Sequence, residues 1–155
     1  MIDDRLFRTA MGKFATGITV VTSHIDGEVR GMTVNAFMSV SLNPKLITVS
    51  IDEKASMYDD LQKVGRFGVS ILADTQKDLS MIFAKQKEQD KEIEFEDADG
   101  VPVLKGSLAT LACTVQQTVK AGDHVLLIAE VTDVQVSEGD PILYFSSSYR
   151  NIENT

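Results

Sequence analysis

Small and hydroxyl-bearing side chains follow one another through a segment that otherwise has the composition of a buried strand. The segment runs from Gly31 to Ser41 and includes Thr33, Asn35 and Ala36. A buried strand normally carries bulky Val, Ile and Leu on its inner face, so such short side chains leave room for a flat molecule against the backbone. An edge strand with a polar face toward solvent would show the same pattern.

The stretch from Thr33 to Ala36 could meet the edge of a heterocyclic ring. Its side chains are short enough for backbone N–H and C=O groups to reach a ligand, and Thr33 and Asn35 add directional hydrogen bonds. An isoalloxazine ring needs donors toward N1, O2 and N5 and an acceptor for N3–H. This stretch is therefore a candidate for contact with such a ring.

A second candidate site lies between Ser50 and Ser56, where a hydrophobic strand is predicted to turn into a helix. Ser56 and the first free backbone N–H groups of that helix could bind an anion, with Lys54 as the counter-charge. Ser56 could equally be a helix cap and Lys54 a surface lysine. The pattern therefore fits a phosphate-binding loop as well as a simple helix cap.

A third candidate is the turn from Ala121 to His124, between two long strand patterns. Gly122 allows a tight turn, and Asp123 could orient the imidazole of His124. A histidine in such a turn can face the rim of a pocket, although most such residues are structural. Spacing alone leaves both readings of His124 open.

Two further features carry weaker signals. Tyr149 and Arg150 follow the last predicted strand and could close over a ligand or a second subunit, or form an aromatic plug at the end of a barrel. Cys113 lies inside an apolar run without a neighbouring base, so it is predicted to be a small core residue rather than a nucleophile.

The composition bounds the class of protein. A chain of 155 residues with 43% hydrophobic residues suits one domain, residues 1–155, with a sizeable core. Its net charge of -8 argues against binding to nucleic acid or anionic membranes. One cysteine and two histidines cannot build a clustered metal site. Neither a membrane-spanning run nor a basic leader is present, so we expect a cytoplasmic protein.

Hydrophobic periodicity predicts the elements that position these candidates. An amphipathic helix is expected over residues 3–15, a short helix over 56–64 capped by Ser56, and another beginning at Thr75. A charged, solvated excursion is expected over 85–99. Strands are expected at 18–23, from 29 onward, and at 38–42, 46–52, 67–73, 107–118, 125–136 and 142–145. Hairpins of this kind predict a mainly β protein, a closed β-barrel with a few short flanking helices.

Motifs along nearly the whole chain resemble the flavin reductase-like family. They occur at Phe7 to Thr22, Gly31 to Phe37, Ser39 to Pro44, Phe67 to Leu72, Leu79 to Ala84, Gly100 to Leu104, Gly122 to His124 and Tyr144-Phe145. The resemblance implies a Greek-key, FMN-binding split β-barrel, usually a homodimer with flavin near the subunit interface. It also implies reduction of FMN or FAD by NADH or NADPH, with release of the reduced flavin to a partner monooxygenase.

The resemblance also assigns residues to the site. The isoalloxazine and ribityl chain would be lined by Met32, Thr33, Val34, Asn35, Ala36, Met38 and Ser39. The ribityl and phosphate end would be lined by Ser50, Asp52, Lys54 and Ser56. Phe83 would lie near the ring, and His124 would contact the nicotinamide in its side of the pocket. Hydride would pass from nicotinamide C4 to flavin N5 with little acid–base help from side chains.

The sequence departs from many relatives in two places. Ser56 and Met57 stand where many have arginine and threonine, and the chain lacks the tryptophan that many carry before Gly100. One scaffold can also host different functions, so a non-enzymatic FMN-binding electron carrier or sensor is the alternative to a reductase.

Overall fold

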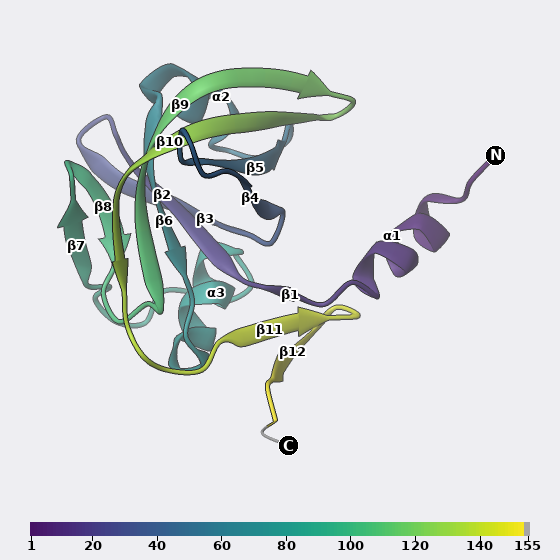
Figure 1. Ribbon diagram of the computed structural model, residues 1–155. Coiled ribbons are helices and arrows are strands. Elements are labelled where there is room, and N and C mark those ends of the chain that lie inside the picture. Colours follow the sequence, from purple (N-terminus) through teal and green to yellow (C-terminus); the bar gives the residue numbers. More distant parts are fainter. Residues whose placement is uncertain (154–155) are drawn as a thin grey trace.

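A seven-stranded antiparallel sheet forms the body of the protein (Figure 1). The computed structural model describes residues 1–153. The strands lie in the order β3, β2, β6, β9, β10, β5, β4. Their bounds are β2 Thr19–Ile25, β3 Glu28–Val34, β4 Phe37–Ser41, β5 Leu46–Asp52, β6 Arg66–Ile71, β9 Ala109–Ala121 and β10 His124–Val136.

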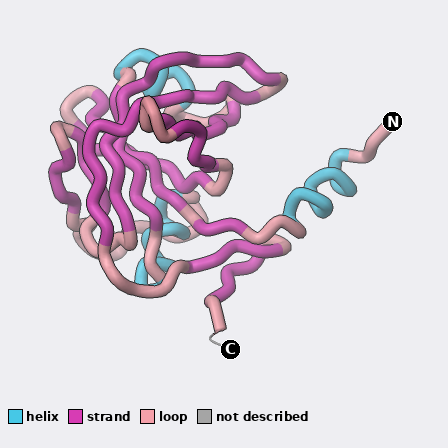
Figure 2. The backbone as a smooth tube through the Cα atoms, viewed as in Figure 1, coloured by secondary structure: helices cyan, strands magenta, loops and turns pink. Residues whose placement is uncertain are grey.

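Two smaller sheets and short helices complete the described chain (Figure 2). The small sheets consist of β1 Thr16–Gly17, β11 Ile142–Phe145 and β12 Ser148–Asn151, and of β7 Phe95–Ala98 and β8 Val101–Leu104. The helices are α1 Asp4–Gly12, α2 Tyr58–Val64, α3 Lys77–Phe83 and the 3-10 turn η1 Asp74–Gln76. Within residues 1–153, each helix is too short or too polar to cross a membrane.

The predicted mainly β fold with a few short helices is confirmed, but closure of the barrel is not. β3 and β4 are the edge strands of the large sheet, and among the described residues no strand pairing joins them. The predicted hairpins are present. Asp26 and Gly27 turn between β2 and β3 with positive φ angles of 52° and 80°, as a two-residue hairpin requires.

Strand alternation gives β5 and β10 one core face and one outer face. The core face carries Ile47, Val49, Ile51, Val125, Leu127 and Ala129, all buried in the main hydrophobic cluster. Cys113 on β9 belongs to the same cluster, and burial raises the pKa of its thiol to about 12. The predicted role of Cys113 as a core residue is therefore confirmed.

The predicted N-cap at Ser56 is wrong. α2 begins only at Tyr58, its N-cap position is Met57, and no side chain caps it. The residues before it are already committed to backbone turns, because Ala55 N–H donates to Asp52 O and Tyr58 N–H donates to Ala55 O. The N-cap of the helix therefore lies one residue later than the Ser56 pattern predicts.

The predicted helix start at Thr75 is also wrong. The Gln76 side chain accepts a hydrogen bond from Ala73 N–H at 2.9 Å, which holds a 3-10 turn ahead of α3. The predicted charged, solvated loop over residues 85–99 is confirmed only in part. Residues 85–94 contain no helix or strand, whereas Phe95–Ala98 forms β7 and places Phe95 edge-on to Phe83, with ring centroids 6.5 Å apart.

α1 projects away from the body of the protein (Figure 1). The predicted amphipathic helix is present, but none of its residues is buried. Its C-terminal end is attached to the β11–β12 turn, where Ser146 N–H donates to Gly12 O at 2.9 Å. The apolar stripe of α1 thus has no cover within the described chain.

Candidate functional site

The outer face of β4, β5 and β10 brings together residues that are far apart in the sequence. Ser50 and Asp52 alternate with core residues on β5, and His124 lies directly opposite Asp52 in the strand register. Met38 on β4 lies opposite Thr48 on β5. Since paired residues point to the same side of a sheet, the four predicted residues Met38, Ser50, Asp52 and His124 share one face.

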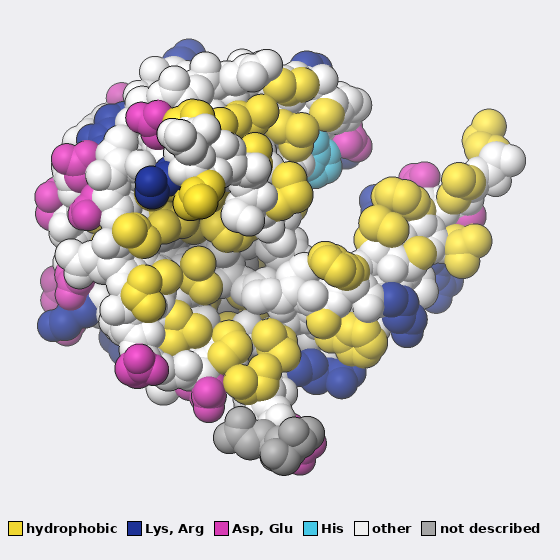
Figure 3. Space-filling view, viewed as in Figure 1, with side chains coloured by type: hydrophobic (Ala, Val, Ile, Leu, Met, Phe, Trp, Pro, Cys, Tyr) yellow, Lys and Arg dark blue, Asp and Glu magenta, His cyan; other side chains and the backbone are white. Residues whose placement is uncertain are grey.

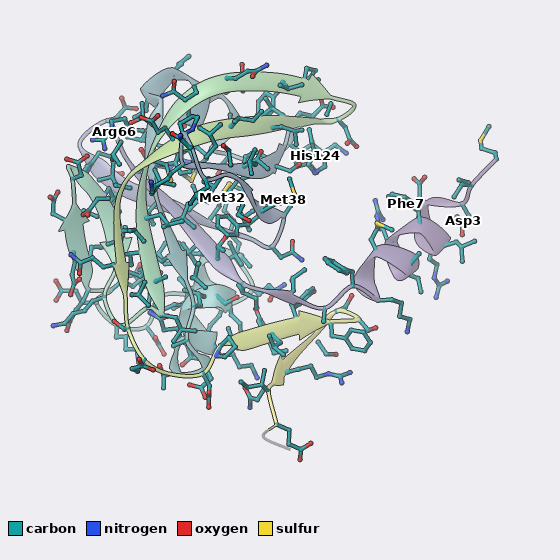
Figure 4. All side chains as sticks on the ribbon, in the orientation of Figure 1. Asp3, Phe7, Met32, Met38, Arg66 and His124 are labelled. Carbon is teal, nitrogen blue, oxygen red and sulfur yellow. The ribbon has the colours of Figure 1, made fainter. Side chains whose placement is uncertain are left out.

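This face borders a hollow in the molecule. Figure 3 shows the hollow between the lobe that carries His124 and the projecting α1. Figure 4 shows Met38 and His124 on the same side of it, with Phe7 of α1 on the other side. The shared outer face is therefore open to a ligand and also to a second molecule.

Thr48 is a residue of this face that sequence reasoning missed. Its hydroxyl is buried and has no hydrogen-bond partner among the described residues. A buried polar group without a partner costs free energy, so such a group often marks a ligand or water position. The signal was present in the sequence, since Thr48 precedes Ser50 and Asp52 at the two-residue spacing of one strand face.

His124 is oriented by its neighbour. Its Nδ1 lies 2.8 Å from Asp123 Oδ1. Because an ionised carboxylate only accepts, Nδ1 carries the proton and Nε2 remains available to a ligand. The hydrogen bond from His124 lowers the pKa of Asp123, which keeps that carboxylate ionised. The turn itself is tied to the end of β5, because Glu53 N–H donates to Asp123 O at 2.9 Å.

The loop after β5 carries the predicted anion-binding residues. Lys54 N–H donates to Asp52 Oδ1 at 2.9 Å, and the side chains of Lys54 and Ser56 are exposed. The first turn of α2 holds Asp59 and Asp60; Asp60 pairs with Arg30 at 2.9 Å, and the exposed carboxylate of Asp59 disfavours an anion at that helix end. Any phosphate contact must therefore come from the loop and not from the helix.

A lysine clamp holds this loop against β9. Lys120 Nζ lies 2.7 Å from Glu53 Oε2 and 5.5 Å from the centre of the Tyr58 ring. The hydrogen bond to Glu53 raises the pKa of Lys120, which therefore stays protonated. The loop that carries Lys54 is thus fixed relative to the hairpin that carries His124.

A small pocket lies next to this face, at the end of β3. Its volume is about 160 Å³, and it is lined by Ile18, Thr33, Asn35, Ser80, Ala84, Gln86, Tyr144 and Tyr149. The Thr33 hydroxyl donates to Ser80 O at 2.7 Å, and the hydroxyls of Ser80 and Tyr149 lie 2.9 Å apart. The pocket joins the outer face through the β3–β4 connection, where Ser50 N–H donates to Ala36 O at 3.0 Å.

Ser80 and Gln86 of this pocket were not among the predicted site residues. Ser80 is buried on α3, and a serine within a short helix gives no sequence signal of a ligand. Tyr149 was expected either to close over a ligand or to plug a barrel end. It lies in the pocket wall with its ring edge-on to Tyr144, and both readings of Tyr149 stay predictions.

Three of the predicted residues pack into the protein instead of facing the hollow. Val34 is buried in the core, and Met32 packs against the same cluster (Figure 4). Phe83 lies against Gly31, where an added Cβ would come within 2.8 Å of its ring. The missing side chain of Gly31 is therefore explained by Phe83 and not by a flat ligand.

Strand alternation also separates two predicted neighbours. Ser39 lies opposite Ile47, whereas Met38 lies opposite Thr48, so their side chains leave β4 on opposite faces. Only Met38 shares the face of His124. Ser39 could reach a ligand on that face only through its backbone.

The chain belongs to the flavin reductase-like family, because the family model for the flavin reductase like domain matches residues 11–153. It is 40% identical over 149 residues to an NADH-dependent flavin reductase of a Rhodococcus species, covering 94% of this chain and 85% of that protein. A solved structure of flavin reductase PheA2 in its native state shares 54% identity and a TM-score of 0.96, over 99% of this chain and 100% of that one. The styrene monooxygenase flavin reductase of Pseudomonas putida S12 shares 40% identity and a TM-score of 0.89, over 96% and 98%.

Proposed function

We propose that this chain is an NADH-dependent flavin reductase, an oxidoreductase that transfers hydride from reduced nicotinamide to a flavin. The observation that carries the proposal is the outer face on which Met38, Ser50, Asp52 and His124 come together in a chain of this family. The relatives named NADH-dependent flavin reductase support NADH as the hydride donor. The electron-carrier alternative has no observation in its favour.

The residues around the outer face fit a flat ring with a polar chain. Asn35 and Ala36 are short and exposed where the ring would lie, and the unpartnered Thr48 hydroxyl offers a hydrogen bond beside Ser50. We assign Thr33, Asn35 and Ala36 to the ring. The polar chain and phosphate are assigned to Thr48, Ser50, Asp52, Lys54 and Ser56. When bound, flavin supplies the hydride-accepting ring, and the protein supplies position and electrostatics.

His124 is assigned to the nicotinamide side. With Nδ1 donating to Asp123, its Nε2 accepts a hydrogen bond from the nicotinamide amide or from a ribose hydroxyl. Such a contact orients the donor without moving a proton, and hydride transfer depends strongly on orientation.

The proposal extends to assembly and partners. We propose a homodimer built on a closed split barrel, working in the cytoplasm with FMN or FAD. The reduced flavin would pass to a monooxygenase, which is supported by the similarity to the reductase of styrene monooxygenase. The exposed outer face and the uncovered α1 support self-association.

Anaerobic addition of NADH to the purified protein with excess FMN, and separately with excess FAD, tests the proposal. Loss of the oxidised-flavin absorbance is followed against a protein-free control. Reduction of many equivalents of flavin per chain is the expected result. Bleaching no faster than the control, with flavin binding confirmed and NADPH equally ineffective, would instead indicate a carrier.

A further inference from the structure

Met38 is a methionine of the outer face that core packing does not explain. Its side chain is 58% exposed. The preceding residue on β4, Phe37, packs against the main hydrophobic cluster, whereas Met38 belongs to none of the clusters formed by the described residues. A single exposed apolar side chain is ordinary on a protein surface. The significance of Met38 therefore depends on what lies beside it.

Met38 lies next to a position that a ligand can occupy. It is paired with Thr48 across β4 and β5, and the Cβ atoms of such a pair are about 4.5–5.5 Å apart. The Thr48 hydroxyl is buried and has no partner among the described residues, as expected beside a ligand or water position. Figure 4 shows Met38 on the same side of the hollow as His124. A ligand that bonds to Thr48 therefore comes within reach of the Met38 thioether.

We propose that Met38 is oxidised to its sulfoxide during turnover when no monooxygenase collects the reduced flavin, an inference that rests on the proposed function. Dioxygen takes two electrons from reduced flavin, the product of that function. The O–O bond breaks, one oxygen atom forms a bond to Met38 Sδ, and the other leaves as water. In total, NADH, one proton, dioxygen and the thioether give NAD⁺, the sulfoxide and water. The thioether is oxidised, and dioxygen is reduced.

The other methionines of the chain provide a comparison. Met11 is 56% exposed, nearly the same as Met38, but it lies on α1, which projects away from the body of the protein (Figure 1). Met1 is fully exposed and Met57 is buried. Exposure alone predicts that Met1 is oxidised first and that Met38 and Met11 follow at similar rates. Formation of the oxidant on the outer face predicts that Met38 is oxidised first.

Oxidation of Met38 changes the surface that faces the flavin. A sulfoxide replaces a flexible apolar side chain with a polar one, so a flat apolar ring packs against it less favourably. Flavin binding therefore weakens when reduced flavin meets oxygen instead of a monooxygenase. Less NADH is then consumed without a hydroxylated product. Methionine sulfoxide reductases reverse this oxidation, so the loss of affinity is reversible.

Isotope labelling tests the site of oxidation. The purified protein turns over NADH and FMN under dioxygen labelled with heavy oxygen, with catalase present to remove free hydrogen peroxide. Peptide mass spectrometry follows each methionine. We expect about tenfold more label in Met38 than in Met11, because proximity to the oxidant raises the rate. A parallel sample receives unlabelled hydrogen peroxide without NADH, which measures the accessibility of both residues. Equal labelling of Met38 and Met11, after correction for this accessibility, would overturn the inference.

Flavin affinity provides the second readout. The Kd for FMN is measured by fluorescence quenching without NADH, before turnover, after turnover and after treatment with a methionine sulfoxide reductase. We expect turnover to raise the Kd about threefold or more, and the sulfoxide reductase to restore it. Met11→Leu should show the same rise, and Met38→Leu should show none. A rise that persists in Met38→Leu would overturn the inference.

The consumption of NADH separates the two possible failures. NADH consumption without label in Met38 would refute the oxidation of Met38 and leave the proposed function standing. No NADH consumption with either FMN or FAD would refute the proposed function, and the inference with it.

Discussion

The helices α3 and α1 differ in what covers their apolar faces: α3 packs against its own chain, whereas α1 does not. α3 has seven residues and packs Leu79 and Phe83 against a buried cluster formed by Ile18, Val20, Leu72, Leu104 and Ile142. α1 has nine residues and a continuous apolar stripe, yet buries no side chain. Both have the periodicity of an amphipathic helix, so the pattern shows that a face needs a partner without showing which molecule provides it.

The partner of α3 is built into the same chain. Gly31 leaves a space on β3 that the Phe83 ring fills, and the Ser80 carbonyl accepts a hydrogen bond from Thr33. α3 thereby fixes the end of β3, from which Asn35 continues to the outer face. α3 therefore positions part of the site within its own chain. The apolar stripe of α1, in contrast, is free to pack against another molecule.

The largest expected effect comes from removing the ring that covers Gly31. Phe83→Ala should lower the free energy of unfolding by about 2–3 kcal/mol, toward the low end for a large aromatic residue because the ring is only partly buried. Urea denaturation at several protein concentrations measures the loss. The loss should be the same at every concentration for Phe83→Ala and should vary with concentration for Phe7→Ala. Concentration-independent losses for both variants would erase the distinction between the two helices.

A larger side chain at Gly31 tests the packing of α3 against β3 by reducing the space that Phe83 occupies. Gly31→Ala would place a Cβ 2.8 Å from the Phe83 ring, so we expect a loss of about 1–3 kcal/mol. Adding Phe83→Leu should recover part of it, because the smaller side chain makes room. A double-mutant cycle measures this coupling. Strictly additive losses would mean that Gly31 is not shaped to fit Phe83.

Burial of the Cys113 thiol predicts a pH-dependent contribution to the free energy of unfolding. Burial raises the pKa of Cys113 from 9.0 to about 12, so the folded chain keeps the thiol proton that the unfolded chain loses. This stabilising contribution is full below pH 9 and is lost as the pH rises toward 12, at up to about 1.4 kcal/mol per pH unit. Comparison with Cys113→Ala in urea at pH 8 and pH 10 isolates it. Rapid reaction of the native thiol with Ellman's reagent at pH 8 would contradict this burial.

A smaller effect is expected where β12 meets α3. The hydroxyls of Tyr149 and Ser80 lie 2.9 Å apart, and Tyr149→Phe removes that hydrogen bond while keeping the ring. The free energy of unfolding should fall by about 1 kcal/mol. Thermal unfolding followed by circular dichroism measures it, with Tyr144→Phe as the matched control, because the Tyr144 ring packs edge-on to Tyr149 and its hydroxyl makes no hydrogen bond among the described residues. A larger loss in the control would show that the Tyr149 contact adds nothing.

Much of the fold could be predicted because local signals agreed with tertiary packing. Asp26-Gly27 and Asn43-Pro44 are turn residues between strongly β-forming runs, and both separate strands as expected. Ser56 failed because the backbone turns of the preceding loop took the place of a cap. Thr75 failed because Gln76, whose side chain bonds to Ala73, imposed a 3-10 turn first.

The site residues that could be predicted from the sequence are those that follow the two-residue alternation of a strand. Ser50 and Asp52 follow the two-residue period, and their register with β10 brings His124 opposite Asp52. That register depends on pairing between distant segments, which no local pattern encodes. Gly31 gave a misleading signal, because a space for Phe83 and a space for a ligand look alike in a sequence.

The assignment of His124 to the nicotinamide side is tested most directly by steady-state kinetics of His124→Ala. His24→Ala is the control, since His24 is exposed on β2 and is not assigned to the site. We expect kcat/KM for NADH to fall about tenfold, the loss of roughly one hydrogen bond, while the flavin Kd changes less than twofold. Equal losses for NADH and flavin, or no loss at all, would contradict the placement of NADH beside His124.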